Sequence, residues 1–340
     1  MKQAFPSEAV DIVIKSFNRP YYLERCIKSI YRYVEGDFKI KILDDGTPPE
    51  YLEKIAALYP GVEIILSPLH KQKSHAIKDH INGKSKYNLF SIPSQFWFDQ
   101  VKQCSDIFLL LEDDIWLTAP INIQAVQEIM KKDSVILIKL SWLGNRNLIL
   151  GKKKRIDKDF EEVLPAVSYF SKLVLLNKFK LGSIAHRLGL MKFEFFLPFY
   201  NYYTVASAFY SRKYWIYLWD EASDKVDEQF QLKRAVQWSM SNRDRYAKSV
   251  NEITKTSFTT SATNMYENVN LDIFHFNYHL NEAWLSGRLD IMNNFPKDIS
   301  IDYIKELLDK AHDEKTTSAE WQRWIDKFKW QYRKLGCEVE

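Results

Sequence analysis

Three adjacent carboxylates, Glu112, Asp113 and Asp114, come directly after the apolar run at 108–111, and the chain turns apolar again after them. A short apolar run of this kind is typical of a strand covered on both faces. Neighbouring carboxylates resist ionising side by side, and a divalent cation removes that conflict. Because Mg²⁺ and Mn²⁺ are usually held by carboxylates and substrate phosphates, the pattern indicates a metal site. A solvated acidic turn after a strand is the alternative.

Two further polar clusters follow predicted strands in the first part of the chain. The clusters are Ser16, Asn18 and Arg19 after a strand at 11–15, and Asp44 and Asp45 after a strand at 38–43. Helical patterns separate these strands, which predicts a parallel sheet with right-handed crossovers. Ligands bind such sheets beyond the carboxyl ends of the strands. We therefore expect both clusters and the carboxylates at 112–114 to meet at one edge of the sheet.

Two acidic residues and two histidines in the second half could also act on a ligand. Asp227 and Glu228 stand at the head of a predicted helix, where free backbone donors and the helix dipole stabilise a carboxylate. Helix capping alone could therefore explain Asp227. His275 and His279 are four residues apart and share a face on a helix or a strand. Such a pair can bind a metal, and hydrogen bonding within the fold is the other interpretation.

Composition and charge exclude some classes of protein. The chain of 340 residues is 46% hydrophobic and 27% charged, which is ordinary for a globular protein. Aromatic residues make up 15%, which suits either stacking platforms for sugars and bases or an aromatic-rich core. The net charge of +4 is too small to indicate nucleic-acid binding. Three widely spaced cysteines suit a reducing compartment. With no signal-peptide pattern and no run of 18 apolar residues, we expect a cytoplasmic protein.

Residues 151–200 are basic and apolar at the same time. They hold ten Lys or Arg against five Asp or Glu, a local surplus in a chain whose total is +4. Apolar and aromatic residues alternate with these lysines. Mixtures of this kind can lie on an anionic membrane surface, which would make the protein peripheral at the inner membrane. The other interpretation is an acceptor-side subdomain with a solvated basic face.

The opening of the chain, DIVIKSFNRPYYLERCIKSI followed by KIKILDDGTPPEYLEKI, resembles the start of a nucleotide-sugar glycosyltransferase of the GT-A fold, as in family 2. The resemblance implies that Ser16, Asn18 and Arg19 lie near the nucleotide. It also implies that Asp45, with Asp44 beside it, contacts the base or the ribose.

The middle of the chain is more similar to family 13, the N-acetylglucosaminyltransferases that act on mannose. LLLEDDIWLTAP matches the Glu-Asp-Asp strand end of that family, whose last acidic residue binds manganese; here this is Asp114. Glu112 and Asp113 would then orient the site or contact the donor. The family's catalytic base is the first of two acidic residues that begin a helix, which implies Asp227, followed by Glu228. The resemblance covers roughly residues 9–145 and 200–260.

The resemblance implies an α/β protein with the GT-A, Rossmann-like fold: a mixed, mainly parallel sheet flanked by helices, with a helical C-terminal extension. We divide the chain into a nucleotide-sugar-binding half at 1–145, an acceptor-binding half at 146–290 that includes 151–200, and the extension at 291–340.

The predicted reaction is an inverting transfer of a hexose or N-acetylhexosamine, dependent on Mn²⁺ or Mg²⁺. The donor would be a nucleotide sugar, with UDP as the favoured nucleotide. The acceptor would be a hydroxyl of a glycan or lipid-linked molecule in bacterial surface polysaccharide synthesis. A nucleotidyltransferase is one alternative, although SFNRP lacks the glycine-rich phosphate loop that such enzymes usually need. An inactive glycan-binding or scaffold protein with the same fold is the other.

Overall fold

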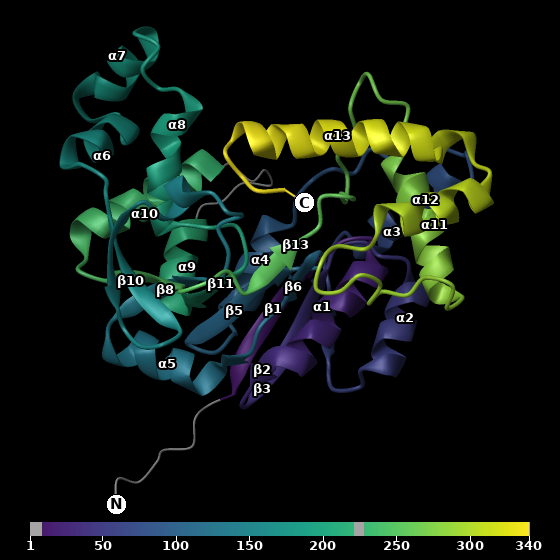
Figure 1. Cartoon of the computed structure of the whole chain (residues 1–340), viewed down its shortest axis with the longest axis horizontal. Coiled ribbons are helices and arrows are strands. Elements are labelled where there is room, and N and C mark those ends of the chain that lie inside the picture. The colour runs from purple at the N-terminus through teal and green to yellow at the C-terminus, as the bar shows by residue number, and fades with distance from the viewer. Residues whose placement is uncertain (1–8, 221–227, 340) are drawn as a thin grey trace, which may run out of the picture.

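The computed structural model describes residues 9–220 and 228–339. In these ranges nine strands form one sheet through the centre of the molecule (Figure 1). In spatial order they are β4 (Glu63–Leu66), β3 (Phe38–Asp44), β1 (Val10–Ser16), β5 (Ile107–Glu112), β11 (Ala208–Ser211), β8 (Val135–Lys139), β12 (Arg245–Ser249), β10 (Phe160–Pro165) and β9 (Gly151–Arg155). β11 and β10 run against the direction that the other strands share. The predicted mixed, mainly parallel α/β fold is confirmed.

The crossovers of the first half are helical, as the sequence predicts. The helices are α1 (Pro20–Tyr33), α2 (Pro49–Leu58), α3 (His70–Ile81), α4 (Ser94–Val101) and α5 (Ile123–Lys132). Pro20 occupies the first turn of α1, where its missing N–H leaves no hydrogen bond unmade. Short pairs flank the sheet: β2 (Val34–Glu35) with β7 (Ile121–Asn122), and β6 (Ile115–Leu117) with β13 (Thr254–Thr256).

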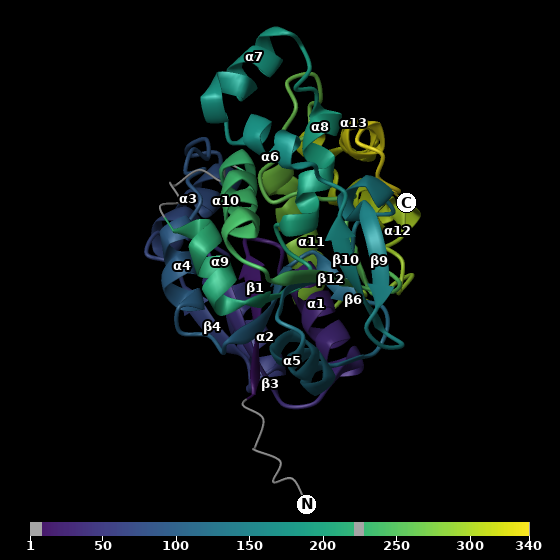
Figure 2. The ribbon, with the colours of Figure 1, turned by 90° about the vertical axis from the view of Figure 1, so that its left-hand side faces the viewer.

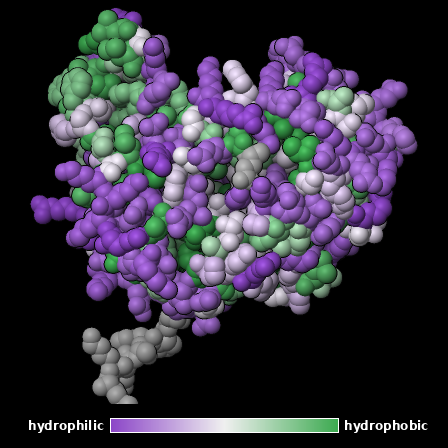
Figure 3. Space-filling view, viewed as in Figure 1, coloured by the Kyte–Doolittle hydropathy of each residue, from purple (hydrophilic) through white to green (hydrophobic). Residues whose placement is uncertain are grey.

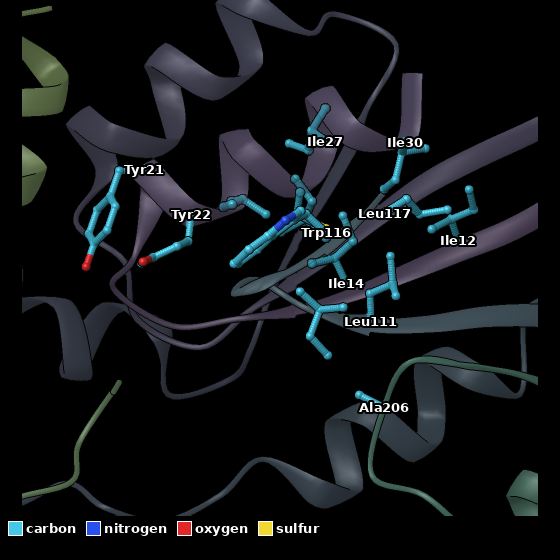
Figure 4. Close-up of a cluster of buried hydrophobic side chains, with 14 of the residues drawn as sticks. Ile12, Ile14, Tyr21, Tyr22, Ile27, Ile30, Leu111, Trp116, Leu117 and Ala206 are labelled. Atoms are coloured by element: carbon cyan, nitrogen blue, oxygen red, sulfur yellow. The ribbon is translucent and has the colours of Figure 1, made fainter. Parts of the chain in front are cut away.

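Apolar side chains cover both faces of the sheet, which explains the unbroken apolar strands. On β1, Ile12 and Ile14 belong to one core, whereas Val13 belongs to the core on the opposite face. In the first core the rings of Tyr22 and Trp116 stack with centroids 6.1 Å apart (Figure 4). Residues of α1 and of the tail fill this core, and residues of α4, α9 (Arg212–Trp219) and α10 (Glu228–Ser241) fill the other.

Residues 151–200 are not one appended insert. Their first part forms the antiparallel β9–β10 hairpin, which extends the central sheet. The rest forms small helices that project from the body beside α10 (Figures 1 and 2). These are α6 (Tyr169–Leu175), α7 (Leu181–Arg187), α8 (Phe193–Phe196) and the 3₁₀ turns η2 (Lys178–Lys180) and η3 (Leu197–Tyr202), with η1 (Arg146–Ile149) before the hairpin. The predicted division at 145 remains a prediction, and the sheet continues across it.

The tail forms α12 (Ile301–Ala311), η4 (Glu314–Thr316) and α13 (Ser318–Lys334) after α11 (Ile273–Leu285). α13 lies across the top of the view in Figure 1. Trp321 and Trp324 are fully buried beneath it, and their indole N–H groups donate to the carbonyls of Thr259 at 2.9 Å and Asn264 at 3.0 Å. The predicted pair of packed C-terminal helices is confirmed. Among the described residues, no helix is both long and apolar enough to cross a bilayer.

Candidate active site

The three polar clusters meet at one edge of the sheet, as predicted. β1 lies between β3 and β5, and its register pairs Ser16 with Asp44 and Lys15 with Glu112. Backbone hydrogen bonds join the segments just beyond the strand ends: Asp45 N–H donates to Ser16 O and Asp113 N–H donates to Lys15 O, both at 3.0 Å. Adjacent parallel strands therefore bring residues a hundred positions apart into one site.

Arg19 binds two of the three carboxylates. One guanidinium nitrogen lies 2.8 Å from Asp114 Oδ2, and the other contacts Asp113 Oδ1. Asp113 Oδ2 also accepts the backbone N–H of Phe17 at 3.0 Å. Arg19 precedes α1 directly, so the start of that helix positions the guanidinium. The buried acidic pair is thus partly neutralised by a cation of the chain itself.

Asp114 keeps one oxygen free. Its Oδ1 is buried and has no hydrogen-bond partner among the described residues. Burial raises the pKa of Asp114; the charge of Arg19 opposes this rise and that of Glu112 adds to it. An unpartnered buried carboxylate oxygen is costly unless something satisfies it. Hard oxygen ligands are what Mn²⁺ and Mg²⁺ take, so these residues fit a divalent cation at Oδ1.

Glu112 is bound differently from its two neighbours. Its carboxylate pairs with Lys15 Nζ at 2.7 Å, and its side chain is 36% exposed. The Lys15 ammonium also lies 4.7 Å from the ring centroid of Trp97. Glu112 is therefore the member of the triplet most open to a ligand.

Asp44 and Asp45 have separate roles. Asp44 is fully buried and accepts the N–H groups of Gly46 at 3.0 Å and Thr47 at 2.8 Å, so it holds the turn after β3. Gly46 has φ 145°, and a Cβ there would lie 2.6 Å from Lys73 Cβ, so the turn requires glycine. Asp45 accepts a 2.6 Å bond from Ser67 Oγ, contacts Lys73 Nζ and faces a cavity.

A first cavity of about 480 Å³ lies against these groups. Of the residues predicted to bind the donor or metal, it is lined by Ser16, Arg19, Asp45, Glu112, Asp113 and Asp114. Asn18 and Asp44 do not line it. Asn18 has φ 53° and gives its backbone N–H to Thr47 Oγ1 at 2.8 Å, so it supports the turn instead.

Other parts of the cavity wall were missed from the sequence. They are Phe17, Tyr87, Phe90 and Trp97 near the start of the chain, the loop at 260–264, and Phe328 and Tyr332 of α13. The high aromatic content was the only signal for the aromatic residues among them, because it allowed stacking platforms without locating them, and nothing indicated that the loop would line a cavity. Phe328 and Tyr332 join the others around the cavity only because α13 packs over it.

A second cavity of about 310 Å³ adjoins the first. Both cavities are lined by Glu112, Asp114, Phe328 and Tyr332. The carboxylates therefore lie where the two cavities meet, beneath one face of α13. Burial first, and then the negative charges of Asp114 and Glu112, raise the pKa of Tyr332 to about 12.

Of the two residues predicted for base catalysis, Asp227 lies outside the described residues. Glu228 begins α10 and lines the second cavity, where its Oε2 accepts the Tyr200 hydroxyl at 2.5 Å. Lys139 lines the same cavity and is 4% exposed; burial lowers its pKa to about 7. The second cavity is thus lined by an acidic and a basic side chain, Glu228 and Lys139, in addition to Glu112 and Asp114.

His275 and His279 line neither cavity. On α11 their ring nitrogens approach Asp313 Oδ2 at 3.0 and 2.8 Å, and Lys315 Nζ lies 3.0 Å from the other nitrogen of His275. Burial would raise the pKa of Asp313, but hydrogen bonds, first that from His279, lower it to about 2. The ammonium of Lys315 occupies the remaining ring nitrogen, so the geometry favours a hydrogen-bonded link to the tail over a metal site.

Residues 11–82 match the model of the family described as Glycosyl transferase family 2. The matched stretch contains both polar clusters at the ends of β1 and β3 and stops before the carboxylate triplet. The fold, the site and this match define the chain as a glycosyltransferase with the GT-A fold, which confirms the predicted enzyme class. The resemblance to family 13 is not confirmed.

Two of the proteins with solved structures that resemble the chain show how weak the likeness is. The structure of S. aureus TarS 1-349 in complex with UDP-GlcNAc is 10% identical, with a TM-score of 0.41, covering 94% of this chain and 80% of that one. Glucosyl-3-phosphoglycerate synthase from Mycobacterium tuberculosis, with Mn²⁺, UDP-glucose and phosphoglyceric acid, is 15% identical, with a TM-score of 0.32, covering 61% of this chain and 58% of that one. No curated protein matches the sequence.

Proposed function

We propose that this protein transfers a sugar from a nucleotide sugar, with UDP as the favoured nucleotide, to an acceptor hydroxyl with inversion at the anomeric carbon. The observation that carries the proposal is the meeting of two cavities at Glu112 and Asp114. Transfer of a group requires donor and acceptor to be held side by side with the reacting atoms in contact. Two adjoining cavities with shared carboxylates meet this requirement.

The donor would occupy the first cavity. Its volume of about 480 Å³ lies in the range of small-molecule sites. Phe17 and Tyr87 offer aromatic surface for a base, and Asp45 offers a carboxylate oxygen for base or ribose hydrogen bonds. Lys73, beside Asp45, and Arg19 supply the positive charge that a diphosphate needs.

A divalent metal would be held at Asp114, through the oxygen that no described residue satisfies. Bound there, Mn²⁺ or Mg²⁺ would supply Lewis-acid stabilisation of the leaving diphosphate. Arg19 would hold Asp113 and Asp114 in place through its two ion pairs.

The acceptor would enter the second cavity. A carboxylate there would take the proton from the acceptor hydroxyl as its oxygen attacks the anomeric carbon, while the bond to the diphosphate breaks on the opposite face. The sequence resemblance favours Asp227 as this base, and Glu228, the next residue in the sequence, lines the second cavity. The role in bacterial surface polysaccharide synthesis and the cytoplasmic location stay predictions.

Donor binding is tested by thermal shift with UDP, GDP and CDP, with and without Mn²⁺, because a ligand that binds only the native state raises the melting temperature. We expect the largest shift with UDP and Mn²⁺ together. Asp114→Asn should lose the metal-dependent part of the shift and at least a factor of about ten in transfer. Asp309→Asn, on the exposed surface of α12, is the matched control. Absence of any metal-dependent nucleotide shift in the wild type would favour the scaffold alternative.

The base is tested by comparing Asp227→Asn with Glu228→Gln. The variant that removes the base should keep the rise in melting temperature caused by the nucleotide, and its turnover should fall by about two orders of magnitude or more. Inversion is read from the anomeric configuration of the product. Release of pyrophosphate from a nucleoside triphosphate and a sugar 1-phosphate, without release of a nucleoside diphosphate from any nucleotide sugar, would identify a nucleotidyltransferase and contradict the proposal.

A further inference from the structure

Exposed apolar side chains are concentrated on the small helices at 169–193. We call this surface the docking face: Tyr169, Phe170, Phe179, Ile184, Leu188 and Leu190, with Phe193 at its inner end, between 42% and 86% exposed. Figure 3 shows the corresponding apolar area at the upper left, over α6 and α7. Contiguous exposed apolar surface of this kind marks an interaction site.

The same segment carries positive charge without any negative charge. From Val163 to Phe193 the sequence contains no Asp or Glu. Lys178, Lys180, Arg187 and Lys192 are exposed beside the apolar side chains. Anionic lipid headgroups attract basic residues near a membrane surface, and apolar side chains enter the boundary below the headgroups.

The docking face is anchored to the body from beneath. Val174 and Leu175 at the end of α6 are buried, and Leu175 belongs to the same core as Phe199 of η3. Lys172 turns inward and donates to Ser239 Oγ of α10 at 3.0 Å. The exposed side chains are therefore the outer surface of a fixed element, which projects from the body (Figures 1 and 2).

The docking face leads into the second cavity. Phe193 is 42% exposed and also lines that cavity, and Leu197, four residues later, lines it in a buried position. Phe193 therefore belongs both to the docking face and to the lining of the cavity that Glu112 and Asp114 also line.

We propose that this face docks on the surface of an anionic membrane and admits a lipid-linked acceptor, whose apolar part follows Phe193 and Leu197 while its hydroxyl reaches the carboxylates. The docking itself is independent of the reaction, whereas the acceptor class rests on the proposed function. A membrane fits better than a second copy of the chain, because a symmetric dimer would bring the four cations of one face against the four of the other.

Vesicle flotation of the full chain tests the docking. With about a third of phosphatidylcholine replaced by phosphatidylglycerol, we expect the protein to float with the vesicles, and binding to fall when NaCl is raised from about 0.1 to about 1 M. Phe179→Ser with Leu188→Ser should lower the partition coefficient at least about tenfold. Leu58→Ser with Leu66→Ser, which are exposed elsewhere, should bind as the wild type does.

A second variant separates charge from apolar surface. Lys178→Glu with Lys180→Glu should weaken binding to anionic vesicles by about fivefold or more for each residue, with little effect on neutral vesicles. A wild type that does not float, or serine variants that float equally well, would overturn the proposal. Loss of a wild-type dimer in the serine variants, without vesicle binding, would assign the face to a second copy instead.

Activity readouts separate this inference from the proposed function. The serine variants should retain transfer to a soluble acceptor analogue and lose transfer to a lipid-linked one in vesicles. Vesicle binding without any sugar transfer would leave the docking intact and refute the function. Equal transfer by wild type and serine variants to the vesicle-bound acceptor would refute the lipid-linked entry path.

Discussion

Arg19 is the residue on which the carboxylate site depends in the absence of any ligand. It is 7% exposed and holds both Asp113 and Asp114. Removing one partner of a buried ion pair leaves an uncompensated charge, which destabilises a protein by about 3–5 kcal/mol. The same site offers Asp114 Oδ1 to a metal, so a cation could compensate for a missing guanidinium.

Arg19→Met should therefore lower the free energy of unfolding by about 3 kcal/mol in the absence of metal. Added Mn²⁺ should recover part of that loss in the variant and raise the wild type by less. Urea unfolding with and without Mn²⁺ measures both effects. Arg146→Met, at an exposed position, should stay within about 0.5 kcal/mol of the wild type. Equal responses to Mn²⁺ in all three proteins would contradict a metal site at Asp114.

Lys139 makes the stability of the protein depend on pH. Burial lowers the pKa of Lys139 to about 7, whereas the pKa of a lysine in the unfolded chain is about 10.4. Between these two pKa values the unfolded chain binds more protons at this lysine than the folded protein does. Through this group, the free energy of unfolding therefore rises with pH from about pH 7 upward. Below about pH 7 its contribution is a constant penalty.

Lys139→Met should remove that dependence. The variant should be more stable than the wild type at pH 7, and the difference should shrink as pH rises toward 9, by at most about 1.4 kcal/mol per pH unit. Chemical denaturation at several pH values measures this difference. Lys131→Met, exposed at the end of α5, should leave the slope unchanged. A difference that is constant with pH would show that Lys139 stays charged in the folded protein.

At the scale of elements, α13 serves both packing and the site. One side of the helix buries Trp321 and Trp324, and another side presents Phe328 and Tyr332 to both cavities. A change that loosens the packing of α13 should therefore also displace Phe328 and Tyr332 from the walls of the cavities.

Trp324→Ala should lower the free energy of unfolding by about 3–5 kcal/mol, because it removes a fully buried side chain and its hydrogen bond to Asn264. Trp330→Ala, on the same helix but 58% exposed, should change stability by less than about 0.5 kcal/mol. Thermal or urea unfolding compares the two. Similar losses in both variants would mean that α13 contributes through helix propensity and not through docking.

At the scale of the whole molecule, the first cavity joins the two ends of the chain. Phe17 and Arg19 form one wall, and Phe328 and Tyr332 form another. The loop at 260–264 also lines this cavity. A donor bound in this cavity would contact all three segments, which belong to the first, the last and an intermediate part of the sequence.

UDP with Mn²⁺ should therefore slow amide hydrogen exchange in 15–19, in 260–264 and in 326–334. Exchange reports local opening, and a ligand that binds only the closed form suppresses that opening. Exchange in α12, away from the cavity, serves as the internal control. Protection confined to 15–19 would mean that α13 does not close over the donor.

The sequence alone was enough to predict the half of the sheet that carries the proposed donor site. Apolar strands, helical crossovers and polar residues at strand ends follow local rules, so the convergence of Ser16, Asp45 and the triplet at 112–114 was predictable. The sequence did not show which of these polar residues face the cavity and which stabilise the turns after the strands. Asp44 and Asp45 are adjacent and chemically alike, and only the direction of each side chain in the folded turn distinguishes them.

Which residues of the rest of the chain face the site follows only from the folded structure. The positions of Phe328, Tyr332 and Glu228 depend on contacts between segments far apart in sequence, which no local pattern encodes. The same holds for 151–200, whose hairpin completes the sheet while its helices expose an apolar, basic face. Composition showed that this stretch is basic and apolar. Which of its apolar residues are buried and which are exposed to a partner depends on how the chain packs, so only the folded structure separates the two groups.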